Sequence, residues 1–248
     1  MSNSYFQFKQ FTIHHERCAM KVGTDGVLLG AWAPFEGLPQ GARLLDIGTG
    51  SGLIALMLAQ RFPQAHVLGI DINEEAVLQA QENIAASPFA ARCNAQCTAL
   101  HTLTQSVASA RSTDGTPLFD AIVCNPPFFE EALLPPDTGR RDARHTVSLP
   151  FDELAQDAAQ LLCPDGRFAV ILPTPAFDAF HLQCFTQGLS LEVRCDVKTT
   201  ARKEPKRTLA CFRKSQDVTR RNDDVLVLTE NVVRSTAYAT LTRDFYLH

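Results

Sequence analysis

Residues 43–61 read RLLDIGTGSGLIALMLAQR, and this stretch decides the fold. The run Arg43–Ile47 is short and mostly apolar, which predicts a buried strand, and Leu53–Arg61 has the length and composition of a helix. A turn rich in glycine lies between them. A strand, a tight turn and a helix in this order form the repeating unit of parallel α/β sheets.

The same alternation continues along the chain. Further strands are predicted at His66–Ile70, Arg92–Cys97, Phe119–Cys124 and Arg167–Leu172, and helices at Glu74–Ala86, Phe151–Leu162 and Pro175–Gln187. Near-continuous apolar strands that alternate with helices predict a doubly wound, mostly parallel sheet.

The alternation of strands and helices ends after this core. Leu189–Val197 and Arg207–Arg213 are two strand-like runs with a basic loop and no helix between them, so we expect them to pair antiparallel. The segment Thr102–Pro117 is rich in Ser and Thr and has little periodicity, so it is expected to be a surface loop.

The composition is that of an ordinary globular protein. Of 248 residues, 45% are hydrophobic and 20% are charged, which is enough to bury a sizeable core. The formal net charge is −4, so binding to a nucleic acid requires a local basic patch. We expect no signal segment and no membrane span, because the N-terminus is polar and no apolar run approaches about 18 residues.

The eight cysteines are scattered and form no C-x-x-C pair. Without a secretion signal, reduced thiols in the cytoplasm are the expected state. The spacing of Cys93 and Cys97 would suit half of a metal site, but no second pair follows, so we expect no metal.

The glycine turn after the first strand is a candidate ligand site. Gly48, Gly50 and Gly52 allow a tight turn, but their G-x-G-x-G spacing differs from the G-x-G-x-x-G of dinucleotide binders. The acid at the end of the strand, Asp46, repels a pyrophosphate and attracts an ammonium or sulfonium group. Asp71 ends the second strand, where a carboxylate can accept hydrogen bonds from ribose hydroxyls. A cation, a ribose and no phosphate together indicate S-adenosylmethionine; the alternative is a glycine turn flanked by solvated acids.

The stretch Asn125-Pro126-Pro127-Phe128 follows a predicted strand in the same way. Two prolines stiffen the backbone, and their carbonyl groups stay free to accept hydrogen bonds. Beside them stand an amide side chain and an aromatic ring, which together could hold a planar amino group still for attack from one side. We predict that these four residues form the catalytic site; the alternative is a proline-rich turn that ends a strand.

With these motifs in this order, the chain resembles the class I S-adenosylmethionine-dependent methyltransferases that modify amino groups. More narrowly, it resembles the bacterial enzymes that methylate adenine N6 at position 37 of tRNA1(Val). The most specific marker is residues 20–30, MKVGTDGVLLG. The resemblance runs from Phe6 to Leu247 and includes Arg144-His145-Thr146 and Lys206-Arg207.

The resemblance implies a seven-stranded, mostly parallel sheet whose final strand pair is antiparallel. It also implies a single domain that spans residues 1–248. Within it, residues 41–214 form the core, residues 1–40 form an extension that contributes to the cofactor site, and residues 215–248 form a C-terminal addition.

The resemblance further implies the cofactor and the substrate, S-adenosylmethionine and tRNA. The implied cofactor contacts are Lys21, Thr24, Asp25, Gly26, Asp46, Gly48, Gly50, Gly52, Asp71 and Ile72. The target adenine is expected to leave its loop and stack on Phe128. Its N6 amino group is then expected to donate hydrogen bonds to the Asn125 side chain and the Pro126 carbonyl.

Two positions depart from the family pattern. Position 128 is Phe where the family usually has Tyr; stacking needs only the ring, but Asn-Pro-Pro-Phe also occurs in guanine-N2 rRNA methyltransferases. Ala99 stands where relatives have an Asp near the cofactor adenine, so a backbone carbonyl or another side chain is needed there. Guanine-N2 methylation, protein-glutamine methylation and a catalytically silent RNA-binding protein stay open as alternatives.

Two clusters of basic residues are predicted to bind the RNA. Residues 198–214 hold seven Lys and Arg residues against one Glu, a local charge of +6. The predicted RNA-binding residues in the two clusters are Lys198, Arg202, Lys203, Lys206 and Arg207, and Arg140, Arg141 and Arg144. The alternative is a pair of solvated loops. We expect a cytoplasmic monomer with no obligate protein partner and no membrane association.

Overall fold

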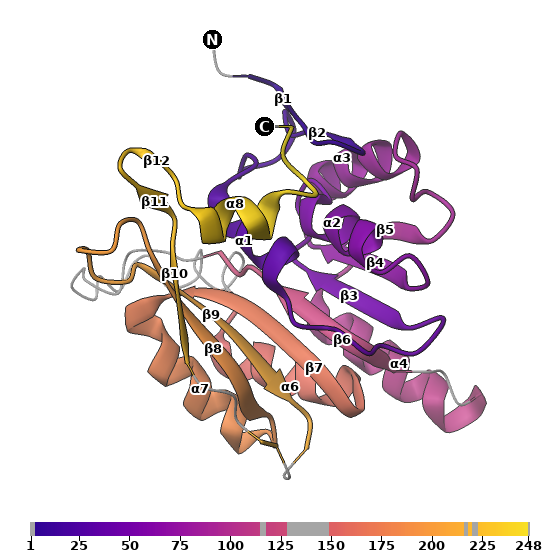
Figure 1. The fold of residues 1–248 in the computed structure, drawn as a ribbon. Coiled ribbons are helices and arrows are strands. Elements are labelled where there is room, and N and C mark those ends of the chain that lie inside the picture. The colour runs from indigo at the N-terminus through magenta and orange to yellow at the C-terminus, as the bar shows by residue number, and fades with distance from the viewer. Residues whose placement is uncertain (1–2, 115–117, 128–148, 216–217, 220–222, 248) are drawn as a thin grey trace, which may run out of the picture.

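An eight-stranded sheet forms the centre of the computed structural model, which describes residues 3–114, 118–127, 149–215, 218–219 and 223–247 (Figure 1). In spatial order its strands are β10 (Asp224–Val227), β8 (Ser190–Lys198), β9 (Arg207–Arg213), β7 (Leu162–Pro173), β6 (Phe119–Cys124), β3 (Arg43–Ile47), β4 (His66–Asp71) and β5 (Cys93–Cys97).

The strand directions confirm the predicted doubly wound, mostly parallel sheet. Strands β5, β4, β3, β6 and β7 run parallel, and β9 is antiparallel to both β7 and β8, as expected for the final pair. The predicted count of seven strands was one too few, because β10 adds an edge strand parallel to β8. This strand has only four residues and begins with an acid, so it gave no strong strand signal.

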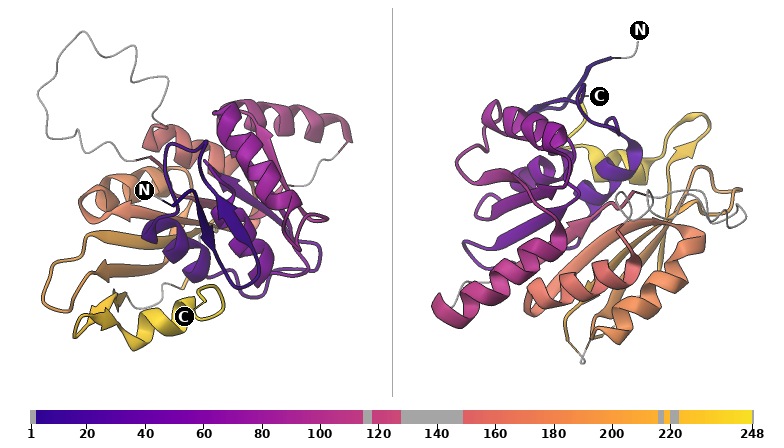
Figure 2. Two further views of the ribbon diagram at one scale, coloured as in Figure 1. Left: turned by 90° about the horizontal axis from the view of Figure 1, so that it is seen from above. Right: turned by 180° about the vertical axis from the view of Figure 1, so that it is seen from behind.

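Helices cover both faces of the sheet. On one face lie α1 (Thr24–Trp32), α2 (Leu53–Arg61) and α3 (Glu74–Ala85), and on the other lie α4 (Leu100–Asp114), α6 (Phe151–Leu161) and α7 (Phe177–Thr186), which follows a short 3-10 turn at Thr174–Ala176 (Figure 2). Alternate strand residues serve the two cores: Leu44 packs on the first face and Leu45 on the second.

The expected loop at Thr102–Pro117 is wrong for its described part, because α4 extends to Asp114. Leu100, Leu103 and Val107 have helical spacing and pack into the core under α6. The hydroxyls of Thr104 and Ser106 donate to the carbonyls of Leu100 and Thr102 at 3.1 Å and 2.9 Å respectively, so these two polar side chains find partners within the helix. One apolar stripe was enough to fix a helix in an otherwise polar segment.

The two ends of the chain pack together beside α1 and α3 (Figure 1). The N-terminal hairpin consists of β1 (Tyr5–Gln7) and β2 (Thr12–His14), and the C-terminal part of β11 (Thr229–Glu230), β12 (Val233–Arg234) and α8 (Thr236–Thr242). The amide of Lys9 donates to the carbonyl of Phe245 at 2.8 Å. No helix within the described residues has the length and apolar character to cross a bilayer.

Candidate functional site

The segments that carry the predicted chemistry meet where β3, β4 and β6 end, a side of the sheet that we call the carboxyl edge. In the register of these strands, Gly48, Asp71 and Asn125 each lie at or directly after the last paired residues. They therefore stand at about one level on adjacent strands. Neighbouring strands lie about 4.8 Å apart, so a ligand of nucleoside size can reach all three positions.

The glycine loop after β3 is anchored to the end of β4. The amides of Gly48 and Thr49 both donate to the carbonyl of Ile70 at 2.9 Å. Gly48 and Gly50 have φ angles of 70° and 54°, in the left-handed region that glycine adopts without strain. A Cβ atom added to either would meet no atom within 4 Å, so a ligand can approach the loop backbone closely.

Gly52 is the last residue of the same loop and lies in close contact with α3. Its φ angle is 81°, and a Cβ atom there would lie 3.3 Å from Cβ of Ala80 on α3. This contact lets α2 and α3 approach each other behind the loop. Gly52 therefore supports the packing behind the loop, while the backbone at Gly48 and Gly50 is open on the side where a Cβ atom would lie.

Asp46 is fully buried at the end of β3. Its Oδ2 accepts from the Thr49 hydroxyl at 2.7 Å and from the amide of Ala55 at 3.1 Å, while its Oδ1 has no partner among the described residues. Burial, and to a lesser extent the charge of Asp71, raise the pKa of this carboxyl to about 7, against the two hydrogen bonds. A buried oxygen without a partner beside an open loop favours a cationic ligand, and S-adenosylmethionine carries an ammonium and a sulfonium group.

Asp71 holds the loop and keeps capacity for a ligand. Its Oδ2 accepts from the amide of Gly50 at 3.0 Å, and its Oδ1 accepts from the amide of Asn73 at 2.9 Å. Each carboxylate oxygen has a further lone pair, so Asp71 can also accept hydrogen bonds from two ribose hydroxyls. Next to it Ile72 is 60% exposed, which offers an apolar surface to a flat base.

The end of β5 lacks an acid, as the sequence indicated. Ala99 is exposed there, and the amide of Thr98 donates to the carbonyl of Asp71 at 3.0 Å. Relatives have an Asp at the position of Ala99. In this chain the polar groups near that position are the Thr98 hydroxyl and the local backbone.

The segment before and within α1 packs against the helix that follows the glycine loop. A Cβ atom on Gly26 would lie 3.0 Å from a methyl carbon of Leu53, so Gly26 allows close approach of α1 and α2. Asp25 accepts from Arg207 Nε at 2.8 Å, which ties α1 to the start of β9. Both residues were predicted as cofactor contacts, and the structure gives each a packing or pairing partner within the chain.

Residues 18–24 lead from the N-terminal hairpin to the start of α1. Burial, and secondly the negative charge of Asp71, raise the pKa of Cys18 to about 11. Lys21 and Thr24 follow on the same segment with exposed side chains.

Asn83 is a supporting residue that sequence reasoning missed. It is buried on α3, and its Nδ2 donates to the carbonyl of Ser51 at 2.9 Å and to the carbonyl of His14 at 2.8 Å. Its Oδ1 accepts from the amide of His14 at 3.0 Å. One side chain thus fastens both the glycine loop and the N-terminal hairpin to α3. The only signal in the sequence is an amide on the apolar side of an amphipathic helix.

The predicted catalytic motif begins at the end of β6. Asn125 is half-buried and makes no side-chain hydrogen bond within the part of the chain that the structure describes. Pro126 is buried and Pro127 is exposed. Phe128 lies outside the described residues. No described residue therefore competes with a ligand for the Asn125 amide.

Residues 30–175 match the family profile described as the methyltransferase small domain. The chain is also 44% identical to a protein of Phocaeicola vulgatus, with 100% of both chains covered, and 43% identical to one of Bacteroides fragilis, with 100% of this chain and 99% of the relative covered. The chain belongs to the methyltransferase small domain family.

Both relatives are named tRNA1(Val) (adenine(37)-N6)-methyltransferase. Among solved structures, a predicted O-methyltransferase from Agrobacterium tumefaciens aligns with a TM-score of 0.67 at 17% identity, covering 89% of this chain and 96% of that one. A likeness at this identity shows the fold alone. S-adenosylmethionine is the methyl donor of this methyltransferase family, and the residues at the carboxyl edge fit its charges.

The predicted basic cluster lies outside the matched methyltransferase domain, and the structure divides it. Residues 198–207 connect β8 to β9 at the carboxyl edge, so Lys198, Arg202, Lys203, Lys206 and Arg207 gather on the side of the site. Arg213 and Lys214 stand at the other end of β9, about 20 Å away. Arg140, Arg141 and Arg144 lie outside the described residues.

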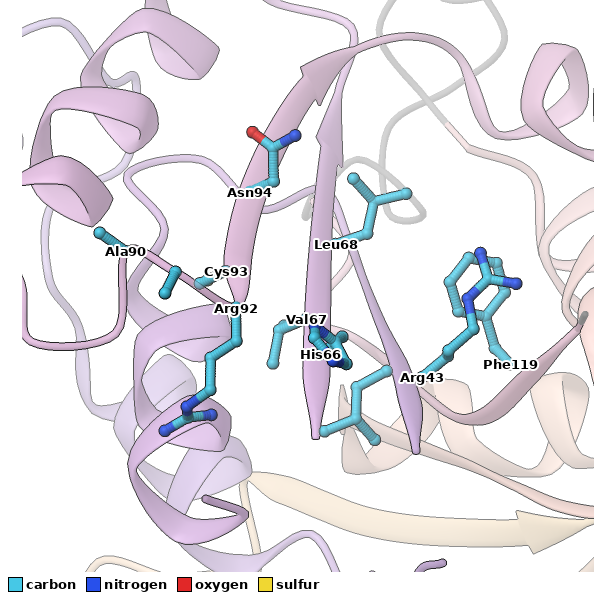
Figure 3. Close-up of a pocket in the computed structure, with 11 residues that line it drawn as sticks. Arg43, His66, Val67, Leu68, Ala90, Arg92, Cys93, Asn94 and Phe119 are labelled. Carbon is cyan, nitrogen blue, oxygen red and sulfur yellow. The ribbon is translucent and has the colours of Figure 1, made fainter. Parts of the chain in front are cut away.

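A cavity of about 440 Å³ lies away from the site, where β3, β4 and β5 begin (Figure 3). Its cations serve the fold of the methyltransferase domain. The Arg43 guanidinium lies over the Phe119 ring at 4.8 Å, and Arg92 donates to carbonyls near the end of α2. This cavity opens on the opposite edge of the sheet and is not part of the candidate site.

Proposed function

We propose that this protein transfers a methyl group from S-adenosylmethionine to the N6 amino group of adenine 37 in tRNA1(Val). The observation that carries the proposal is the position of Asn125-Pro126-Pro127 at the end of β6, level with the glycine loop and Asp71. Relatives of 43–44% identity over the full length, named for this reaction, support the choice of substrate.

The residues that bind the cofactor lie at the ends of strands β3 and β4. Asp46 provides negative charge for the ammonium group, and the backbone of Gly48 and Gly50 lines the approach. Asp71 accepts from the ribose hydroxyls, and Ile72 covers one face of the adenine. When bound, S-adenosylmethionine supplies an electrophilic methyl group whose C–S bond breaks as the new C–N bond forms.

The catalytic side consists of acceptors in fixed positions. The Asn125 side-chain oxygen and the Pro126 carbonyl accept the two hydrogens of the adenine amino group. An exocyclic amine is a poor nucleophile because its lone pair delocalises into the ring, and two acceptors out of the ring plane favour a pyramidal nitrogen. The reaction then releases one proton, which solvent at this edge can take. Positioning and electrostatics supply most of the acceleration.

The substrate side uses the basic connection between β8 and β9. Lys198, Arg202, Lys203 and Lys206 stand at the edge where the base must enter, and they provide charge for the phosphates of the RNA. We propose the cytoplasm as the place of action, since all eight cysteines are free thiols and the substrate is a tRNA. We also propose that the protein acts as a monomer.

The substrate can be tested with an unmodified tRNA1(Val) transcript and labelled S-adenosylmethionine. Nuclease digestion and mass spectrometry should find N6-methyladenosine, and a transcript with guanosine at position 37 should accept no methyl group. Formation of N2-methylguanosine, or transfer to a protein glutamine only, would replace this proposal with one of the alternatives. Absence of transfer to any cellular RNA would favour a silent binding protein.

The catalytic role of Asn125 can be tested separately. Asn125→Ala should lower the rate of methyl transfer by about 10²–10³-fold, as for other lost acceptors and donors at a reacting centre, while cofactor affinity stays near normal. Asn94→Ala, at an exposed position on β5, is the matched control and should leave the rate unchanged. Near-normal turnover in Asn125→Ala would exclude the mechanism.

A further inference from the structure

A second cavity, of about 510 Å³, lies between α8, β12 and the N-terminal segment. Eight residues line it: Lys9, Val233, Arg234, Ala239, Thr242, Arg243, Tyr246 and Leu247. We call it the C-terminal cavity. It is lined entirely by the two ends of the chain, outside the matched methyltransferase domain, and no part of the proposed reaction uses it.

Three of the lining side chains are cations. The Lys9 ammonium donates to the backbone carbonyl of Arg243, a neutral group that leaves its charge in place. Arg243 faces Asp244 at 3.6 Å, but both side chains are more than 70% exposed, so water screens this pair. The Arg234 guanidinium lies over the Tyr246 ring, 4.3 Å from its centre. The described lining thus holds three cations and no acid, in a chain whose net charge is −4.

The combination of charges and a ring suits a phosphate-bearing ligand. Phosphate oxygens accept hydrogen bonds from several cations at once. Valine, leucine and tyrosine side chains on the same walls can contact a sugar or a base. Nucleic acid offers all of these groups along one strand.

The segment that leads into the β11–β12 hairpin is hydrogen-bonded to the basic connection at the carboxyl edge. The amide of Leu228 donates to the carbonyl of Lys198 at 2.9 Å, and the amide of Thr229 donates to the carbonyl of Thr199 at 3.0 Å. The hairpin that carries Arg234 therefore begins next to the basic segment. Figures 1 and 2 show the β8–β9 connection and the β11–β12 hairpin side by side.

We propose that the C-terminal cavity binds phosphate groups of the RNA substrate, away from the base that is methylated. The inference rests on the proposed function, since it takes the substrate to be an RNA. In this arrangement one strand of the RNA crosses residues 198–206 at the carboxyl edge and continues over β12 to Lys9 and Arg243. The cavity contributes affinity and orientation, and it has no part in the chemical step.

The test uses the double variant Lys9→Gln/Arg243→Gln and measures tRNA affinity by fluorescence anisotropy over a range of salt concentrations, without cofactor. The double variant should bind tRNA about tenfold more weakly near 0.1 M salt, and the slope of log K against log salt should become shallower by about 1–2. Arg213→Gln removes a cation at the opposite edge of the sheet and should change neither quantity.

Folding and chemistry are checked in the same proteins. The double variant should keep the unfolding temperature and the cofactor affinity of the wild type, and its KM for tRNA should rise while kcat stays constant. Arg243→Lys keeps the charge and should bind tRNA nearly as well as the wild type. If the variant loses stability, Arg243→Gln alone still serves, because that side chain is 72% exposed.

Wild-type affinity and salt slope in the double variant would overturn the inference while leaving the proposed methylation intact. Equal loss of affinity for polyglutamate and for tRNA would also overturn it, since the site would then recognise acidic peptides. Failure of the wild type to methylate tRNA would instead contradict the proposed function. The binding measurement needs no turnover, so the two failures can be told apart.

Discussion

Asp46 is subject to two opposing demands. Complete burial favours its neutral form, while a cationic ligand needs the carboxylate. Gly69 on β4 makes room for the arrangement, because a Cβ atom there would lie only 2.5 Å from the Thr49 hydroxyl that bonds Asp46. The fold therefore holds an acid in a place where charge is costly until a ligand supplies the opposite charge.

Cofactor affinity should consequently depend on pH. With the pKa of Asp46 at about 7 in the free protein, most molecules carry a neutral carboxyl at pH 6 and a charged one at pH 8. We expect S-adenosylmethionine to bind about tenfold more weakly at pH 6 than at pH 8, measured by isothermal titration. Asp46→Asn should bind weakly at both values. An affinity independent of pH in the wild type would contradict this role of Asp46.

The raised pKa of Asp46 also affects stability, in the opposite direction: raising the pH strengthens cofactor binding but lowers the free energy of unfolding. The pKa of Asp46 is about 7 in the folded chain and near 4 in the unfolded chain, so the folded state holds the proton more tightly. The stability that this group contributes is complete below pH 4 and declines as the pH rises to about 7. Asp46→Asn should therefore unfold at a higher urea concentration than the wild type at pH 8, and the difference should vanish near pH 4.

Val232 is strained at the tip of the β11–β12 hairpin. It is 96% exposed and has a φ angle of 70°, a conformation in which a β-branched side chain crowds the backbone. Val232→Asn should raise the free energy of unfolding by about 1 kcal/mol, because Asn tolerates the left-handed region. The neighbouring Val233→Asn, in ordinary strand geometry, should give no gain. Thermal unfolding of both variants distinguishes strain relief from a simple gain in polarity.

At the scale of elements, α3 connects the glycine loop to the N-terminal hairpin through Asn83. Asn83→Ala leaves the amide and carbonyl of His14 and the carbonyl of Ser51 without their partner. We expect a loss of about 2–4 kcal/mol in the free energy of unfolding and weaker cofactor binding, since the loop loses its support. Urea unfolding and a cofactor titration measure the two effects.

Gln79→Ala is the matched control, one turn earlier on α3. Gln79 is equally buried, but its amide bonds only Glu82 on the same helix, at 3.3 Å. Gln79→Ala should lower the free energy of unfolding by less than Asn83→Ala does, and it should leave cofactor affinity unchanged. Equal losses of cofactor affinity in the two variants would show that α3 acts through its general packing and that Asn83 has no special role.

The predicted elements succeeded where an apolar run is bounded by turn residues. The helix Leu53–Arg61 and the strand Arg43–Ile47 have the predicted limits, since glycines and a change of period mark both ends. The helix α4 was missed because its Ser and Thr residues favour turns, and only packing against α6 decides for the helix. Strand β10 was missed because a four-residue edge strand depends on its neighbour β8.

At the scale of the whole molecule, parallel topology explains why the core of the site could be predicted. Motifs that follow parallel strands must meet at one edge, so Asp46, Asp71 and Asn125 could be grouped from the sequence alone. The pairs Asp25–Arg207 and Asn83–His14 join residues far apart in the chain, and nothing local marks them. The C-terminal cavity needs both ends of the chain, which no sequence period places together.

The packing of the two chain ends couples the C-terminus to the cofactor site. Phe245 is 2% exposed, its carbonyl accepts from the Lys9 amide, and the next residue, Tyr246, stacks on Phe8 with ring centres 6.0 Å apart. The segment that contains Lys9 joins the two strands of the N-terminal hairpin, which Asn83 fastens to the glycine loop. A change at the C-terminus should therefore reach the loop through the hairpin.

Phe245→Ala tests this coupling. The variant should lose about 3–5 kcal/mol in the free energy of unfolding, as expected for a large buried ring, and cofactor affinity should fall with it. Amides of residues 5–14 should exchange hydrogen faster, because the hairpin loses its support. Leu247→Ala, at a 45% exposed position two residues further on, should change neither the stability, nor the cofactor affinity, nor the exchange of these amides. Normal protection of the hairpin in a destabilised Phe245→Ala would show that the two ends pack together without transmitting support to the site.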